Sequence, residues 1–165
     1  NNIRLSPLFH GGNQENEVRS GTENVAGNVS FVRALRLLKE REKISMHDMK
    51  EQQILLLHRL SEIEGVHVNS TIDGAPHIIN FSIPGLRAET VIHAMYEAGF
   101  VISTQSACSS KRNDISRILQ AYGLSEEIAK SGLRVSLSYG TTKTEVEQFL
   151  QSLEETIIQL KEILE

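Results

Sequence analysis

Two short segments in which apolar and polar residues alternate, 77–83 and 133–137, constrain the fold of this chain most strongly. Such alternation is typical of strands that bury one face and leave the other polar. The residues expected on the buried face are Ile79, Phe81, Ile83, Leu133, Val135 and Leu137. A sheet with one apolar face must be covered on that face by other elements.

Segments with helical periodicity lie around these strands. Their apolar residues recur every three or four positions, as an amphipathic helix requires. Ser45 is the expected N-cap between the first two helices, and Gly65 is expected to stop the second. The predicted helices cover 24–42, 45–64, 88–98, a short stretch that begins at Asp114, and 144–164.

Two further strands are predicted at 66–68 and 100–102, and the second leads into a small polar loop, 103–110. The resulting order is helix, helix, strand, strand, helix, strand, helix, strand, helix. This order predicts an α+β fold with a mainly antiparallel sheet covered by helices.

The composition excludes several classes of function. A net charge of −4 and an aromatic content of 5% give neither the basic surface nor the stacking platform of a nucleic-acid binder. No apolar run approaches the roughly 20 residues of a membrane span, and no signal peptide is visible. The single cysteine rules out an internal disulfide and fits a reducing cytosol. We therefore expect a cytoplasmic protein without direct nucleic-acid or membrane partners.

That cysteine, Cys108, is the first candidate for chemistry. It follows a predicted buried strand, and loops held by a rigid scaffold often carry function. Lys111 and Arg112 follow closely, and nearby cations favour the reactive thiolate. By composition alone, an incidental thiol is the commoner case.

Arg134 is the second candidate. The alternation of 133–137 directs Arg134 and Ser136 away from the core. An arginine held on a strand is well placed to bind a carboxylate through two parallel hydrogen bonds. Without further information, a solvated arginine on an open sheet face is the commoner case.

The third candidate is the segment 19–22, Arg-Ser-Gly-Thr, which precedes a predicted helix. Its backbone N–H groups and the Thr22 hydroxyl suit a phosphate, although for such a segment alone an ordinary turn and helix entry is the commoner case. The six histidines show no metal-site spacing, because His47 and His58 lie about three helical turns, roughly 16 Å, apart. His10, beside a glycine pair, is a further residue that could line a site.

Three blocks of the chain resemble the pyridoxal-phosphate-dependent cysteine desulfurases of the class-V aminotransferase group. Residues 11–24, GGNQENEVRSGTEN, are similar to the G-G-x-Q-E…R-S-G-T-x-N stretch of that family. Residues 103–110 resemble the loop that bears its sulfur-carrying cysteine, and residues 133–138 resemble its R-[IV]-S-[LF] strand. The order and separations of the blocks fit over nearly the whole chain.

The resemblance implies a role for each candidate residue. Cys108 would take sulfur from L-cysteine and become a persulfide, and Arg134 would bind the substrate carboxylate. Thr22 would contact the phosphate of pyridoxal 5'-phosphate, across a homodimer interface. The implied reaction yields L-alanine and passes the sulfur to an acceptor protein. Iron–sulfur cluster assembly, tRNA thiolation and thiamine synthesis all stay open as pathways.

The resemblance also implies a domain organisation. Residues 25–165 would form the small C-terminal domain of a fold-type I pyridoxal-phosphate enzyme, and residues 1–24 would be a strip of its large domain. The family's cofactor lysine, in a Ser-x-His-Lys type segment, has no counterpart, because none of the seven lysines follows a histidine. We therefore expect that lysine upstream of Asn1 and an inactive isolated fragment. In the cysteine loop, Gln105 stands where the family commonly has glycine.

Two other interpretations remain open. The chain would also suit a selenocysteine lyase or another class-V aminotransferase. A non-catalytic module that binds a partner, with an incidental cysteine, is the alternative from a different class.

Overall fold

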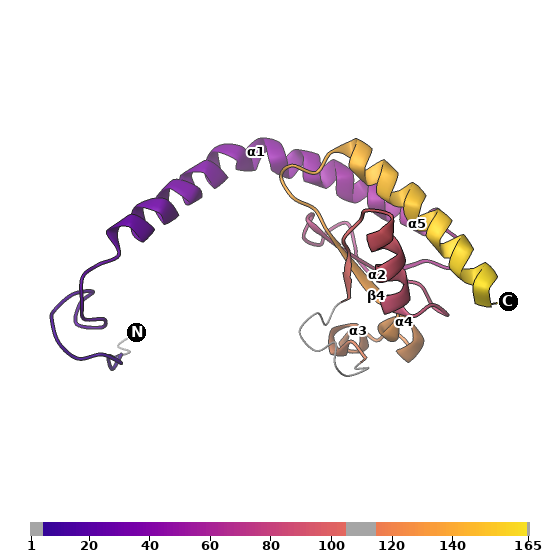
Figure 1. The fold of residues 1–165 in the computed structure, drawn as a ribbon. Helices are drawn as coiled ribbons and strands as arrows, with labels where there is room; N and C mark the ends of the chain where they lie inside the picture. The colour runs from indigo at the N-terminus through magenta and orange to yellow at the C-terminus, as the bar shows by residue number, and fades with distance from the viewer. Residues whose placement is uncertain (1–4, 105–114, 165) are drawn as a thin grey trace. The chain divides into compact units, whose positions relative to one another are not determined.

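The computed structural model describes residues 5–104 and 115–164 (Figure 1). The chain divides into two compact units, unit 1 (Asn1–Lys43) and unit 2 (Ile44–Glu165). Helix α1 (Val25–Glu62) contributes to both units. Cys108 and Gln105 lie outside the described residues.

The helix α1 is continuous where two helices were predicted, so the prediction of a break at Ser45 is wrong. The sequence from 28 to 64 contains neither glycine nor proline, and therefore no residue interrupts the ladder of backbone hydrogen bonds. Gly65 follows the end of α1 with a φ of 84°, a conformation that glycine adopts without strain.

Unit 2 is built on an antiparallel sheet with the strand order β1-β2-β4-β3. Its strands are β1 (His67–Val68), β2 (Ile78–Ser82), β3 (Ser103–Thr104) and β4 (Gly132–Ser136). At the centre, Ile79 lies opposite Val135 and Phe81 opposite Leu133. The predicted α+β fold with a mainly antiparallel sheet is confirmed.

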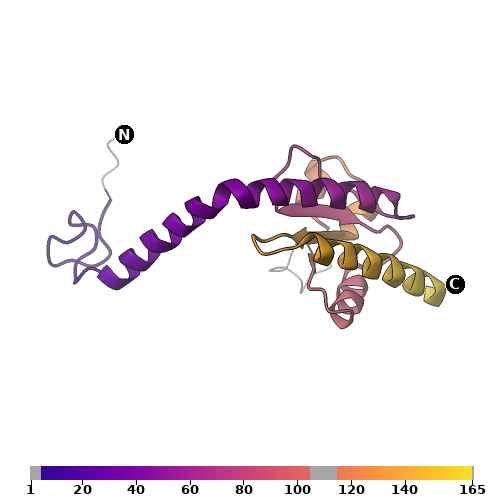
Figure 2. The same ribbon diagram turned by 90° about the horizontal axis from the view of Figure 1, so that it is seen from above.

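The apolar face of the sheet packs against α2 (Ala88–Glu97), α5 (Lys143–Leu164) and the second half of α1 (Figure 2). One continuous core contains side chains from all of these elements, including Leu56, Leu60, Ile79, Phe81, Val91, Met95, Leu133 and Leu153. Burial of each such side chain stabilises the fold by about 1.5–3 kcal/mol. The helices therefore hold the sheet by its apolar side, and the polar side remains for other contacts.

The strand predicted at 100–102 begins later, because pairing with β4 starts only at Ser103. Phe100 instead packs edge-on against Phe149 of α5, with ring centroids 5.7 Å apart. Ile102 is buried in the core. Packing against the core, and not strand pairing, therefore accounts for Phe100 and Ile102, whereas Val101 between them is exposed.

Two short helices follow, α3 (Arg117–Ala121) and α4 (Glu126–Lys130). The N-cap of α3 is Ser116, whose Oγ accepts a hydrogen bond from the Leu119 amide at 3.3 Å, whereas the predicted start at Asp114 lies outside the described residues. The sequence did not predict α4, because a helix of five residues is too short to show a period.

A reciprocal cap begins α5. The backbone amide of Thr142 donates to Glu145 Oε2 at 2.7 Å, and the Glu145 amide donates to Thr142 Oγ1 at 3.2 Å. The Thr142 amide, and next its hydroxyl, hold the pKa of the Glu145 carboxyl below its ordinary value. Within the ranges described, no helix is long and apolar enough to cross a bilayer.

Candidate functional site

The polar face of the sheet carries Arg134. The register of β4 buries Leu133 and Val135 on the core side and turns Arg134 to the opposite side, as the alternation predicted. Arg134 lies between two partners across the strands, Asn80 of β2 and Ser103 of β3. The side chain is half-buried, so the sheet and its connections partly shield the guanidinium from water.

Within the sheet, the Arg134 guanidinium has one hydrogen-bond partner. Its Nη2 donates to Ser103 Oγ at 3.1 Å. Its Nε is buried and has no acceptor in the part of the chain that is described. A buried donor without a partner is costly, and it marks a group that an incoming acceptor would satisfy.

No carboxylate of residues 5–104 and 115–164 pairs with Arg134. The ion pairs found in those ranges all lie along helices, as between Arg36 and Glu40 at 3.1 Å. A half-buried guanidinium without a counter-charge favours binding of an anion, and its planar fork matches a carboxylate.

A network of neutral side chains begins at Asn80, the residue opposite Arg134 on β2. Asn80 Nδ2 donates to the Leu133 carbonyl at 2.7 Å, and Asn80 Oδ1 accepts from Asn69 Nδ2 at 2.7 Å. Asn69 Nδ2 also lies 2.8 Å from Ser82 Oγ, which donates to the Ile128 carbonyl of α4 at 2.8 Å. These residues were not predicted as part of a site, although Asn80 and Ser82 alternate with the apolar residues of β2.

The loop of unit 1 that precedes α1 contains Thr22. Arg19 Nη1 donates to the Gly21 and Thr22 carbonyls at 3.1 and 2.8 Å. The Gly21 amide donates to Gln14 Oε1 at 3.3 Å, and this hydrogen bond links the two ends of the loop segment 14–21. Thr22 is exposed, and within the described residues its hydroxyl forms no hydrogen bond, so it is available to a ligand.

The same loop has an unusual backbone. Glu15, Asn16 and Glu17 have φ values of 52°, 56° and 66°, in the left-handed region that side chains disfavour. Their turn is closed by a hydrogen bond from the Val18 amide to the Glu15 carbonyl at 3.1 Å. Strained residues of this kind cluster at ligand sites and switch regions.

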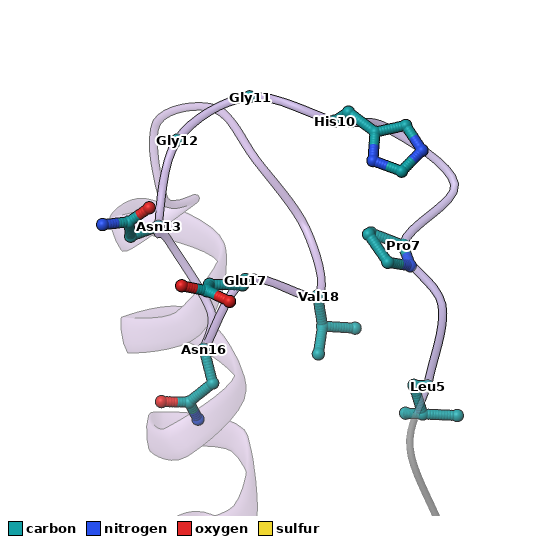
Figure 3. Close-up of a pocket in the computed structure, with 9 residues that line it drawn as sticks. All are labelled: Leu5, Pro7, His10, Gly11, Gly12, Asn13, Asn16, Glu17 and Val18. Atoms are coloured by element: carbon teal, nitrogen blue, oxygen red, sulfur yellow. The ribbon is translucent and has the colours of Figure 1, made fainter.

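A hollow of about 860 Å³ lies within this loop (Figure 3). The lining residues mix apolar and polar groups: Leu5, Pro7, His10, Gly11, Gly12, Asn13, Asn16, Glu17 and Val18. His10, which the sequence marked as a residue that could line a site, is among them. Thr22 is not. In the described part of the chain, no group of three or more side chains is arranged to hold a metal ion.

The candidate residues therefore fall in three places. Arg134 belongs to the sheet of unit 2, Thr22 to the loop of unit 1, and Cys108 lies outside the described residues. The segment with Cys108 follows β3 directly in the sequence, and β3 carries the hydroxyl that binds Arg134.

Comparison with known proteins gives a consistent family. The class-V aminotransferase family matches residues 8–149. A NifS/IcsS protein homolog of Lactobacillus delbrueckii subsp. bulgaricus is 35% identical over 157 residues, which cover 92% of this chain and 40% of that protein. Cysteine desulfurase IscS of Pectobacterium carotovorum is 33% identical and covers 98% of this chain and 40% of its own length. The chain thus spans about 40% of the curated relatives that it matches.

Solved structures agree with the sequence relatives. A NifS-like protein superposes with a TM-score of 0.79 at 29% identity, covering 95% of this chain and 40% of its own. The NifS-like protein of Rickettsia africae superposes with a TM-score of 0.78 at 28% identity, covering 95% and 41%. These likenesses confirm the expected fold, the small-domain part of a fold-type I enzyme.

Proposed function

The chain belongs to the class-V aminotransferase family, and on that basis we propose that it is the C-terminal part of a cysteine desulfurase. The whole enzyme removes sulfur from L-cysteine, releases L-alanine and passes the sulfur to an acceptor protein. Its relatives include proteins named as cysteine desulfurases, which supports this activity over other class-V reactions. The single cysteine supports a cytosolic location.

The observation that carries the proposal is the guanidinium of Arg134, which has no ion-pair partner among the described residues. It is half-buried, it lacks a carboxylate partner among the described residues, and its Nε has no acceptor. A cysteine carboxylate would supply the missing charge and acceptors. Arg134 therefore orients the substrate through its carboxylate, at the other end of the molecule from the reacting sulfur.

The residues present also suit the cofactor. The exposed Thr22 hydroxyl would bind the phosphate of pyridoxal phosphate, across the interface of a homodimer, and the glycine-containing loop provides further N–H donors. When bound, pyridoxal phosphate supplies an electron sink that weakens the substrate C–S bond.

Cys108 is the proposed sulfur carrier. Its thiolate attacks the sulfur of bound cysteine, so that an S–S bond forms while the C–S bond breaks. The electron pair of the broken bond remains on the carbon side, and the carbon takes a proton to become the methyl group of L-alanine. The sulfur stays on Cys108 as a persulfide until an acceptor removes it.

Substitution of Arg134 tests the proposal. In the full-length protein, Arg134→Ala should raise KM for L-cysteine by the equivalent of about 2–3 kcal/mol, the loss of one charged hydrogen-bonding partner. Arg36→Ala is the matched control, because Arg36 is exposed on α1 and pairs only with Glu40 among the described residues. Equal effects of the two substitutions on KM would remove Arg134 from the site.

We further propose that the 165-residue chain by itself neither desulfurates cysteine nor binds the cofactor covalently, because none of its seven lysines lies in the family's segment. Borohydride reduction followed by peptide mapping tests this. A cofactor-modified lysine among the seven would contradict it.

Three alternatives can be distinguished, two of them through Cys108 and one through substrate preference. An ordinary class-V aminotransferase needs no cysteine in the loop, and hence would keep its activity after Cys108→Ala. A selenocysteine lyase would prefer selenocysteine over cysteine as substrate. A non-catalytic module would have an ordinary thiol, which reacts with iodoacetamide no faster than free cysteine at neutral pH.

A further inference from the structure

We propose that Ser103 is a positioning residue for the substrate carboxylate, acting through Arg134. Its hydroxyl holds the guanidinium in the orientation in which the free N–H groups receive the carboxylate. This inference rests on the proposed function of Arg134, and it adds a determinant of substrate affinity that the sequence motifs do not assign.

The first support is the geometry of the pair. Ser103 and Arg134 lie directly opposite each other in the β3–β4 register, and Arg134 Nη2 donates to Ser103 Oγ at 3.1 Å. Both side chains are half-buried. The contact is therefore set by strand pairing and not by two freely rotating surface side chains.

The second support is the direction of the hydrogen bond. Ser103 Oγ donates its only proton to the backbone carbonyl of Thr104 at 2.8 Å. The lone pairs of the hydroxyl are thus left to accept from Arg134. The serine acts as a fixed acceptor for the guanidinium.

The third support is that the neighbour on the other side is already occupied. Asn80, opposite Arg134 on β2, uses its Nδ2 for the Leu133 carbonyl and its Oδ1 for Asn69. Among residues 5–104 and 115–164, Ser103 is the side chain that accepts from this arginine. Removal of its hydroxyl would leave the guanidinium without that anchor.

The bond to Ser103 also leaves donors for the substrate. A guanidinium has five N–H groups, and this bond uses one of the two on Nη2. Among the described residues, Nε and Nη1 have no acceptor and Nη2 keeps one proton, which leaves enough donors for two parallel bonds to a carboxylate. Ser103 therefore orients Arg134 without competing with the ligand.

The test uses the full-length protein with its cofactor bound and compares Ser103→Ala with the unsubstituted protein. KM for L-cysteine should rise by about 3- to 10-fold, the indirect effect of losing one hydrogen bond that orients the guanidinium, while kcat changes less than about 2-fold. The Ki of cysteamine, a competitor without a carboxylate, should stay unchanged. Ser136→Ala is the matched control, because Ser136 lies on the same face of β4 and is exposed.

A second pair of variants separates the hydroxyl from folding. Ser103→Thr keeps the hydroxyl and should keep KM. Ser103→Val has the shape of threonine without the hydroxyl, and should raise KM. An unchanged KM in both Ser103→Ala and Ser103→Val would overturn the inference, and so would an equal weakening of cysteamine and cysteine.

Arg134→Ala, measured in parallel, distinguishes this inference from the proposed function. If Arg134→Ala raises KM and the Ser103 variants do not, only the role of Ser103 is wrong. If Arg134→Ala leaves KM unchanged, the carboxylate site itself is wrong, and the inference about Ser103 is overturned with it.

Discussion

Asn80 Nδ2 donates to the backbone carbonyl of Leu133 at 2.7 Å, inside the sheet and one residue before Arg134. The asparagine is only 9% exposed, and its Oδ1 accepts from Asn69. This side chain therefore links β2 to β4 in addition to the backbone ladder, and it anchors the polar face on which Arg134 lies.

Asn80→Ala should destabilise the fold by about 1–3 kcal/mol, because Asn69 and the Leu133 carbonyl each lose a buried hydrogen-bond partner. The free energy of unfolding in urea measures this cost. Gln148→Ala, which removes an exposed amide from α5, is the control and should change it by less than about 0.5 kcal/mol. Similar values for the two variants would show that the buried network contributes little.

Glu145 should make the start of α5 sensitive to acid. Its pKa is lowered in the folded chain from an ordinary value of 4.5, so its stabilising effect is present above that pH and is lost as pH falls through the lowered pKa. Glu145→Gln should therefore be less stable than the unsubstituted chain near neutral pH, and the difference should shrink in acid.

Urea unfolding at several values between about pH 2.5 and 7 checks this expectation. Glu147→Gln is the matched control, since Glu147 is exposed on the same helix and pairs with Lys143 at 3.8 Å. A difference between Glu145→Gln and the unsubstituted chain that did not vary with pH would contradict the role of the cap.

The first turns of α1 in unit 1 expose large apolar side chains, with Phe31 at 70%, Val25 at 65% and Val32 at 63%. Large apolar side chains exposed close together along one helix promote association. We expect the 165-residue chain to self-associate, and Phe31→Lys to shift it toward smaller species in sedimentation velocity. Asn28→Lys adds the same charge at an exposed polar position and should shift it less. Equal shifts would assign the effect to charge alone.

Cys108→Ser should abolish persulfide formation and acceptor sulfuration in the full-length protein, while the absorption spectrum of the bound cofactor stays unchanged. The reason is that serine offers no thiolate to take the sulfur. Alkylation followed by mass spectrometry locates the persulfide. If no persulfide were found on Cys108 of the unsubstituted protein, this cysteine would be an incidental thiol.

The sequence by itself determined the local character of the elements and the family. Alternation in 77–83 and 133–137 was sufficient to predict which side chains of β2 and β4 face the core, and that Arg134 does not. Short-range periodicity carries this information because side-chain direction depends only on the backbone of the same element. The three motif blocks were likewise sufficient to predict the family that the comparisons show.

Only the tertiary structure decided which residues surround Arg134. The strand order β1-β2-β4-β3 places Asn80 on one side of it and Ser103 on the other, from segments 54 and 31 positions away (134 − 80 and 134 − 103). Period and propensity describe a strand but not its neighbours, which depend on packing and register across the whole sheet. For the same reason, the start of β3 at Ser103 followed from its pairing with β4, whereas Phe100 and Ile102 before it pack into the core.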